Sequence, residues 1–187
     1  SSYRVFLLNW EAQTFEGKTR YELVSDGTEI VVEAESSSSA SGLIHRQRID
    51  LYKTPFLNWR WKVNHSLYRL FETVKEGDDF AARIYIIEDG GLFFWNTFGL
   101  NYVWASSQVK GSSWENPYTG NVKMIAIESG DTKKQKWLSE KRNVRKDLKS
   151  QFNRDIRFID AVAIMTDTDN SKQHVRAFYG DIYFSSQ

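Results

Sequence analysis

Apolar and polar residues alternate along much of this chain, which is the pattern of half-buried β-strands. The clearest example is Leu57–Val63, in which four apolar residues alternate with three polar ones. Because successive side chains of a strand point to opposite faces, this run predicts one core face and one solvent face. Tyr21–Ser25 and Glu29–Ala34 are separated by a turn that begins with Asp26 and Gly27. An Asp-Gly pair between two such runs predicts a β-hairpin.

Strand patterns outnumber helix patterns along the rest of the chain. Asn143 is suited to cap a helix that runs to Asn153, and Ser66–Lys75 predicts a second, shorter helix. The small residues of Ser36–Ser41 predict a loop. Many short strands with few helices predict an all-β protein, an antiparallel β-sandwich with one or two short helices, formed by residues 1–187 as a single domain. The other predicted strands are Leu43–Ile49, Phe80–Ile87, Leu92–Phe98, Asn101–Ser106, Val122–Glu128, Phe158–Thr166 and Val175–Phe184.

Composition narrows the function classes. The 187 residues carry a formal net charge of +1, which argues against a nucleic-acid partner because phosphate contacts require a basic excess. The absence of cysteine rules out disulfides and thiolate chemistry, and no apolar run reaches the ~18 residues of a membrane span. Seven Trp, nine Tyr and twelve Phe are either core residues or flat platforms for sugars or bases, and composition does not separate the two uses.

The densest polar candidate site begins just after Gly77. If Phe80–Ile87 is a strand, Asp79, Arg83 and Tyr85 share one face and the other face is apolar. A carboxylate, a guanidinium and a phenol on one sheet face can bind a sugar or an acidic ligand through hydrogen bonds. The alternative is a structural ion pair between Asp79 and Arg83 with Tyr85 packed beside it.

Three further groups are candidate ligand-binding residues. Tyr102 and Trp104 share a strand face, so they form either a stacking platform or a pair of core residues. Trp114 lies in a polar stretch with Tyr118, and such loops often carry recognition. Glu140 and Arg142 share a face if their segment is extended.

Asp167, Asp169 and Asn170 follow the D-x-D-N order in which a calcium loop begins. The glycine and the distant glutamate of an EF-hand are missing, so the segment predicts either a different calcium site or a turn rich in Asp and Asn. The three histidines show no metal-ligand spacing. Calcium is therefore the one candidate cofactor.

Five long, ordered motifs lie along the chain, namely Asn58–Val63, Gly77–Tyr85, Leu100–Ser106, Glu140–Val144 and Met165–Asn170. They resemble those of DUF3047, a family of uncharacterised bacterial proteins often made with a signal peptide. The resemblance extends from about Trp10 to Phe184 and implies an exported, periplasmic or secreted protein with no established activity. The closing Tyr179–Phe184 is also similar to the last strand of galactose-binding-like jelly rolls, which include carbohydrate-binding modules.

Three functions remain open at this point. The leading one is a non-catalytic module that binds a glycan or another small polar ligand through the polar and aromatic residues above. The second is a polysaccharide hydrolase or lyase that uses a carboxylate pair. The third is a protein-interaction domain of the cell envelope, which predicts an exposed apolar patch. The sequence leaves ligand and oligomeric state open, and the carboxylates for the second function would come from Asp79, Glu140, Asp147 and Asp167.

Overall fold

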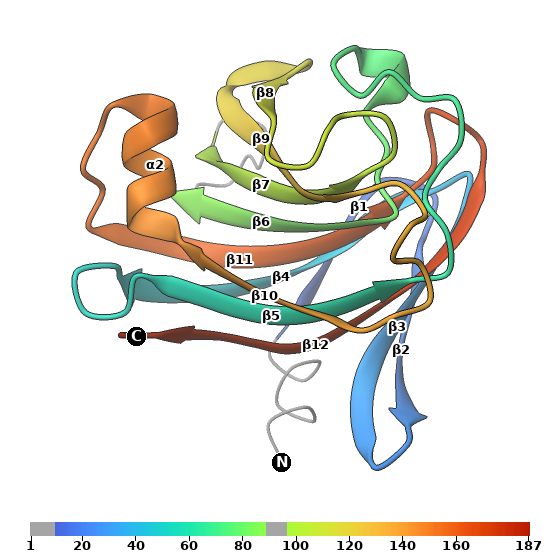
Figure 1. The fold of residues 1–187 in the computed structure, drawn as a ribbon, viewed down its shortest axis with the longest axis horizontal. Helices are drawn as coiled ribbons and strands as arrows, with labels where there is room; N and C mark the ends of the chain where they lie inside the picture. Colours follow the sequence, from blue (N-terminus) through green and yellow to red (C-terminus); the bar gives the residue numbers. More distant parts are fainter. Residues whose placement is uncertain (1–9, 89–96) are drawn as a thin grey trace.

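Two β-sheets pack face to face in the computed structural model of the chain, which describes residues 10–88 and 97–187 (Figure 1). The all-β sandwich predicted from the sequence is confirmed. The larger sheet has the order β1 (Glu11–Glu16), β4 (Ala40–Asp50), β11 (Phe158–Asp167), β6 (Ala82–Glu88), β7 (Phe98–Ala105), β9 (Thr119–Ser129) and β8 (Ser113–Asn116). The smaller sheet has the order β10 (Leu138–Asn143), β5 (Phe56–Val63), β12 (His174–Ser185), β3 (Glu29–Ser37) and β2 (Arg20–Asp26).

One strand pair departs from the antiparallel prediction, because β7 and β9 run parallel. After β7 the chain first forms the short strand β8 and then β9. Strand β8 forms an antiparallel pair with β9, which turns the direction of the chain twice. The residues between β7 and β9 therefore include β8, which is an edge strand of the larger sheet.

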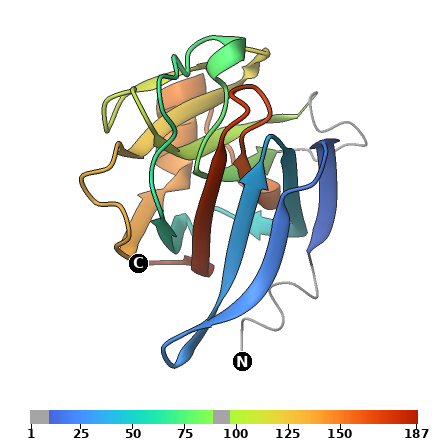
Figure 2. The ribbon, with the colours of Figure 1, turned by 90° about the vertical axis from the view of Figure 1, so that its right-hand side faces the viewer.

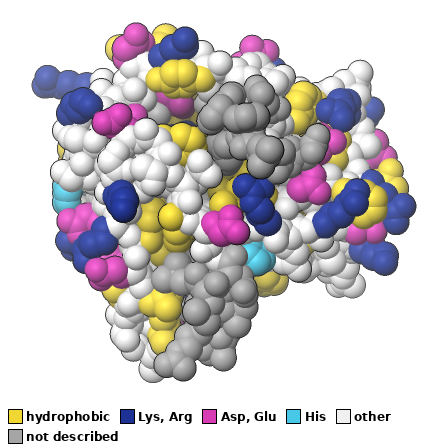
Figure 3. Space-filling view, turned by 180° about the vertical axis from the view of Figure 1, so that it is seen from behind, with side chains coloured by type: hydrophobic (Ala, Val, Ile, Leu, Met, Phe, Trp, Pro, Cys, Tyr) yellow, Lys and Arg dark blue, Asp and Glu magenta, His cyan; other side chains and the backbone are white. Residues whose placement is uncertain are grey.

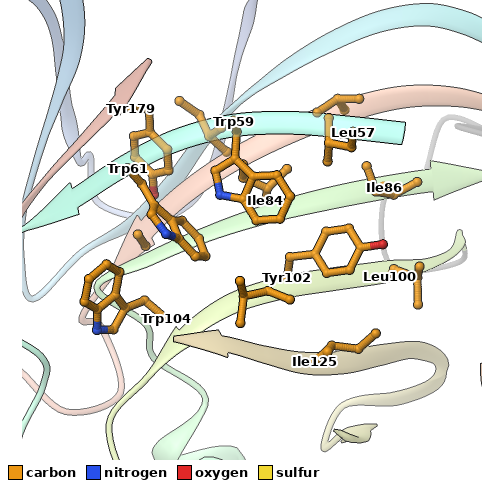
Figure 4. Packing of buried hydrophobic residues seen from close by; sticks show 14 of the residues in the cluster. Leu57, Trp59, Trp61, Ile84, Ile86, Leu100, Tyr102, Trp104, Ile125 and Tyr179 are labelled. Atoms are coloured by element: carbon orange, nitrogen blue, oxygen red, sulfur yellow. The ribbon is translucent and has the colours of Figure 1, made fainter. Parts of the chain in front are cut away.

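Strand β5 forms one wall of the core between the sheets. The alternation predicted for Leu57–Val63 is present, since its four apolar residues are at most 1% exposed. Figure 4 shows Trp59 and Trp61 of β5 directed toward the side chains of β6, β7 and β9. Trp59 stacks on Tyr102 with ring centroids 5.4 Å apart, and Trp61 meets Trp104 edge-on at 5.8 Å. Aromatic burial between the sheets therefore accounts for much of the unusual Trp content.

The predicted hairpin is formed by β2 and β3, and it extends beyond the rest of its sheet (Figures 1 and 2). Gly27 has φ +64°, which a glycine adopts without steric cost. The loop predicted at Ser36–Ser41 is shorter than expected, because β3 runs to Ser37 and β4 begins at Ala40. The serines fit this turn because their hydroxyls are bonded, as in the 2.9 Å bond from Ser36 Oγ to the Ser39 carbonyl.

The helix predicted over Ser66–Lys75 is absent, and only a single 3₁₀ turn, η1 (Lys75–Gly77), forms there. Arg69 has φ +55°, which breaks a right-handed helix. Glu72 is fully buried and accepts hydrogen bonds from the backbone N–H groups of residues 106, 107 and 108 at 2.7–3.1 Å. Tertiary anchoring of this acidic side chain therefore overrides the helical spacing of its apolar neighbours.

The helix predicted after Asn143 is present as α2 (Val144–Phe152) at one end of the sandwich (Figure 1). The Asn143 side chain accepts a hydrogen bond from the Lys146 N–H at 3.0 Å, which is an N-cap. Within the described ranges, no helix has the length and apolarity needed to cross a membrane. Of the strand predicted at Leu92–Phe98, residues 92–96 lie outside the described residues.

Candidate functional site

A pocket of about 350 Å³ lies on the face of the larger sheet that is turned away from the smaller one. Strand β6 provides its floor, because Arg83 and Tyr85 line the pocket while the intervening Ile84 belongs to the core between the sheets. The end of β11, the loop that follows it and the turn from β8 to β9 complete the walls. Its polar and acidic lining includes Asp78, Arg83, Asn116, Asp167, Asp169 and Asn170.

Arg83 is the central cation of this pocket, although its side chain is only 2% exposed. Its Nη2 forms an ion pair with Asp167, and its Nη1 lies 3.7 Å from Oδ1 of Asp78. The rings of Phe80 and Tyr85 lie 4.9 and 5.3 Å from its guanidinium carbon, which fixes the group by cation–π contact. In the described part of the chain, Nε and Nη1 of Arg83 find no hydrogen-bond acceptor. These unused donors at the floor of a pocket can bind an oxygen of a ligand.

Asp79 occupies a different position from the one predicted. Strand β6 begins only at Ala82, so Asp79 precedes the strand and does not share its face with Arg83 and Tyr85. Its Oδ2 accepts a 2.6 Å hydrogen bond from the Ser171 N–H, and its Oδ1 accepts one of 3.3 Å from the Asn170 N–H. Asp79 therefore fastens the loop between β11 and β12 behind the pocket.

Carboxylates outnumber cations in this region. Asp78, Asp79 and Asp167 are each at most 7% exposed, Asp169 is half-buried, and Arg83 is the buried cation among them. Burial raises the pKa of Asp78 to about 6, against the opposing effect of Arg83. Burial and the neighbouring Asp79 also raise the pKa of Asp169. By contrast, acidic and basic side chains are interspersed over the face of the molecule in Figure 3.

Two exposed aromatic rings stand at the rim. Tyr118, in the turn between β8 and β9, is 56% exposed, and Phe15 of β1 is 42% exposed. Asn116 of β8 also lines the pocket and places its Nδ2 3.5 Å from both carboxylate oxygens of Asp78. The predicted ligand residue Trp114 lies beside the pocket instead, half-buried against Phe80 with ring centroids 6.4 Å apart.

The candidate calcium ligands lie in the same region. Carboxylate oxygens of Asp79, Asp167 and Asp169 lie within 4.8 Å of one another, so two of the three predicted ligands belong to this group. Asn170 instead donates from Nδ2 to Asp79 at 3.4 Å. The Arg83 guanidinium on Asp167 repels a cation at that carboxylate, while the excess of acid attracts one. A calcium site here stays a prediction.

Two predicted ligand residues belong to the core instead. Tyr102 and Trp104 are 0% and 1% exposed and point between the sheets, opposite to the face that carries the pocket (Figure 4). The Tyr102 hydroxyl donates to Asp147 at 2.7 Å, and the Trp104 Nε1 donates to the carbonyl of Gly130 at 3.0 Å. The prediction that they contact a ligand is corrected, because neither ring is accessible.

Glu140 and Arg142 lie on β10 of the smaller sheet, outside the pocket. Arg142 forms a bidentate pair with Asp147 at 2.8 and 2.9 Å. Burial, together with the adjacent Glu128, raises the pKa of Glu140 to about 7. Of the four carboxylates considered for hydrolysis, Asp167 alone lines the pocket, and Asp79 adjoins it from behind.

The sequence pattern did not single out Asp78 and Asn116 as ligand residues. Asp78 precedes a strand and Asn116 ends another, so neither has the alternation that assigns a side chain to a face. The available signal for Asp78 was its place in the Gly77-Asp78-Asp79 run. Consecutive residues of an extended segment point to opposite sides, so one of the two aspartates faces the pocket when the other faces away.

Comparison with solved structures finds similar overall arrangements at low identity. The xyloglucanase domain of NopAA from Sinorhizobium fredii, solved with cellobiose, is 12% identical, with 95% of this chain and 93% of that one covered and a TM-score of 0.49. A Cel12A cellulase derived from Rhodothermus marinus is 10% identical, with 95% and 96% covered and a TM-score of 0.46. The module TmCBM61, solved with β-1,4-galactotriose, is 11% identical, with 94% and 86% covered and a TM-score of 0.38.

These overlays stay below a TM-score of 0.5, so none of them is evidence for an activity of this chain. No curated protein matches the sequence. The model of one family, described as proteins of unknown function (DUF3047), matches residues 8–183. The chain therefore belongs to the DUF3047 family.

Proposed function

We propose that this domain binds a glycan, without chemical change, in the pocket on β6. The observation that carries the proposal is the buried Arg83, a lining residue of the pocket, whose Nε and Nη1 have no hydrogen-bond acceptor in the described chain. A buried polar group without a partner is costly, and a ligand oxygen supplies the partner. An exported location remains what the family resemblance implies.

The chemistry of the rim suits a sugar. A sugar ring offers hydroxyls that both donate and accept hydrogen bonds, together with a flat C–H face that stacks on an aromatic ring. Arg83 and the amide of Asn116 donate, Asp78 accepts, and Tyr118 presents an exposed ring beside them. The pocket volume of about 350 Å³ lies within the roughly 300–1,000 Å³ of small-molecule sites, and is small enough to hold only a short segment of a chain.

A polysaccharide hydrolase is the second candidate, and one observation favours it. Asp78 has a pKa raised to about 6 by burial, as a proton-donating acid requires, and Asp169 lines the same pocket. Binding and hydrolysis are separated in one experiment, because mass spectrometry of the incubated oligosaccharides detects shorter products. We expect the oligosaccharides to remain intact.

Tyr118→Ala should weaken glycan binding about tenfold, which corresponds to the ~1.4 kcal/mol of one stacking contact. The ring is 56% exposed, so its loss removes little buried area and the melting temperature should change by no more than about 2 °C. The measurement is isothermal titration calorimetry of wild type and variant against a panel of β-linked oligosaccharides.

Tyr183→Ala is the matched control for this variant. Tyr183 has the same side chain and a nearly identical exposure of 55%, but it lies on β12 of the other sheet. Its replacement should leave the affinity unchanged. Equal losses in the two variants, or no loss in either, would place glycan binding elsewhere.

A further inference from the structure

The charges around the pocket are not balanced by the protein. Asp78, Asp79, Asp167 and Asp169 face one buried guanidinium, Arg83, so three negative charges are formally in excess. Lys75 stands at the rim with its Nζ 5.3 Å from the Tyr118 ring, but it is exposed and screened by solvent. Buried charge is normally either paired or removed by proton uptake, and a ligand group of positive charge would supply the pairing that this region lacks.

The four carboxylates differ in how well they are satisfied. Asp79 accepts backbone N–H groups on both oxygens, and Asp167 holds Arg83 on one oxygen and the Phe80 N–H on the other. Asp78 has only long contacts, namely the Asn116 amide at 3.5 Å and Nη1 of Arg83 at 3.7 Å. Its oxygens therefore keep the capacity for short hydrogen bonds to a ligand donor.

An acidic ligand does not suit this arrangement. A ligand carboxylate that approached the free donors of Arg83 would meet Asp78 beside Nη1 and Asp167 on Nη2, and like charges at such distances repel strongly in a buried site. A divalent metal ion needs about six to eight oxygen ligands, whereas Asp79 and Asp167 already accept N–H donors and a guanidinium adjoins the latter. An ammonium group needs only a few acceptors and brings its own donors.

We propose that the pocket selects glycans with a free amino group, such as β-1,4-linked glucosamine oligomers, over neutral and acidic glycans. The ammonium lies against Asp78 and the adjoining Asp169, while a neighbouring hydroxyl accepts from Nε or Nη1 of Arg83. This selectivity rests on the proposed glycan-binding function. In this arrangement the cationic group of the ligand contacts Asp78 and Asp169, and a neutral hydroxyl contacts Arg83. The fold already holds all three side chains in place.

The test compares oligosaccharides of equal length by calorimetry at pH 7: a glucosamine tetramer, its N-acetylated form, cellotetraose and tetragalacturonate, with calcium chloride titrated alone. We expect the glucosamine tetramer to bind at least tenfold more tightly than the acetylated form, and the acidic tetramer to bind most weakly. Raising the salt concentration should weaken the binding of the amine and leave the neutral sugars unaffected.

Asp78→Asn should lower the preference for the glucosamine tetramer over its acetylated form at least tenfold. The amide of asparagine keeps the shape of the side chain but carries no charge. Glu76→Gln is the matched control. It also removes one negative charge, but from an exposed side chain that lies two positions before Asp78 in the sequence. The asparagine variant should also melt at a higher temperature than wild type above pH 6. In the wild type the folded pKa of Asp78, about 6, lies above the unfolded value of about 3.9, so this gain should shrink as the pH falls from 6 toward 4.

The outcomes distinguish a failure of the amine selectivity from a failure of the proposed glycan-binding function. Equal binding of the amine and its acetylated form, or tightest binding of the acidic tetramer, would overturn the selectivity and leave glycan binding intact. Failure of all four sugars to bind would overturn both. Calcium binding that Asp78→Asn leaves intact and that raises the melting temperature, without sugar binding, would make the carboxylates a metal site and also overturn the selectivity.

Discussion

Replacement of Arg83 by methionine should lower the free energy of unfolding at pH 7.5 by about 3–5 kcal/mol, as expected when one partner of a buried ion pair is removed. The guanidinium lies between Asp167 and Asp78, and methionine fills similar space without charge. Its loss would leave these buried carboxylates without a cation. Urea denaturation, followed by tryptophan fluorescence, measures the difference.

The deficit of this variant should shrink as the pH falls from 7.5 toward 6. Arg83 lowers the pKa of Asp78 against the effect of burial, so its removal raises that pKa further above the unfolded value. Between that raised pKa and about 6, the folded variant holds a proton that folded wild type does not, so its stability relative to wild type rises as the pH falls across this range. Arg46→Met is the control, because its 3.7 Å pair with Glu11 is exposed and contributes at most about 1 kcal/mol. A pH-independent deficit, or none, would contradict the charge arrangement described for the pocket.

Trp61→Ala should destabilise the protein by about 3–5 kcal/mol, the usual cost of removing a large buried aromatic side chain. Trp61 is 0% exposed and makes edge contacts with Trp59 and Trp104, at 5.4 and 5.8 Å between ring centroids. The cavity would lie between the two sheets, where closely packed side chains relax into it only in part. The same urea denaturation measures the loss.

Trp61→Phe should cost much less, below about 2 kcal/mol, because the ring contacts are partly kept. The substitution also removes an indole N–H that has no hydrogen-bond partner within the described residues. Phe71→Ala controls for the loss of an aromatic ring at the surface, since Phe71 is 75% exposed and its removal should change stability by no more than about 0.5 kcal/mol. Similar losses for Trp61→Ala and Phe71→Ala would be incompatible with a core built on β5.

The sequence predicted the sandwich because alternation is a local signal. In Leu57–Val63 the apolar side chains match the core face without exception, and Asn143 caps its helix as its side chain suggests. The same signal does not say which of two apolar-rich faces is covered. Tyr102 and Trp104 alternate as a stacking platform would, yet the second sheet covers them.

The pocket could not be predicted as a unit because its parts are brought together only by the fold. Arg83 reaches Asp167 across 84 positions of the sequence, and Asn116 reaches Asp78 across 38. The Ser66–Lys75 segment shows another limit of local pattern. Its apolar residues have helical spacing, but the tertiary hydrogen bonds of Glu72 hold the segment in a non-helical conformation. Local pattern indicated the chemical groups, and only strand order and loop packing determine which of them meet.

The excess of acid around the pocket is what we expect of a ligand site and not of an ion-pair network that serves stability alone. A network that serves stability alone pairs its charges, as Arg142 and Asp147 do with two hydrogen bonds at 2.8 and 2.9 Å. Asp78 is held within a buried cluster with no short partner, which costs stability that a neutral side chain would recover. Such a cost is characteristic of residues kept for a ligand.

The most direct test of the pocket is nuclear magnetic resonance of the labelled protein during titration with the glucosamine tetramer. The Arg83 Nε–H is buried and without a hydrogen-bond acceptor in the described chain, so its signal should shift as a ligand oxygen binds to it. Side-chain amide signals of Asn116 and Asn170 should move with the same affinity. Saturable shifts confined to the outer face of the smaller sheet, or an Arg83 signal that stays fixed while the sugar binds, would contradict a ligand site on β6.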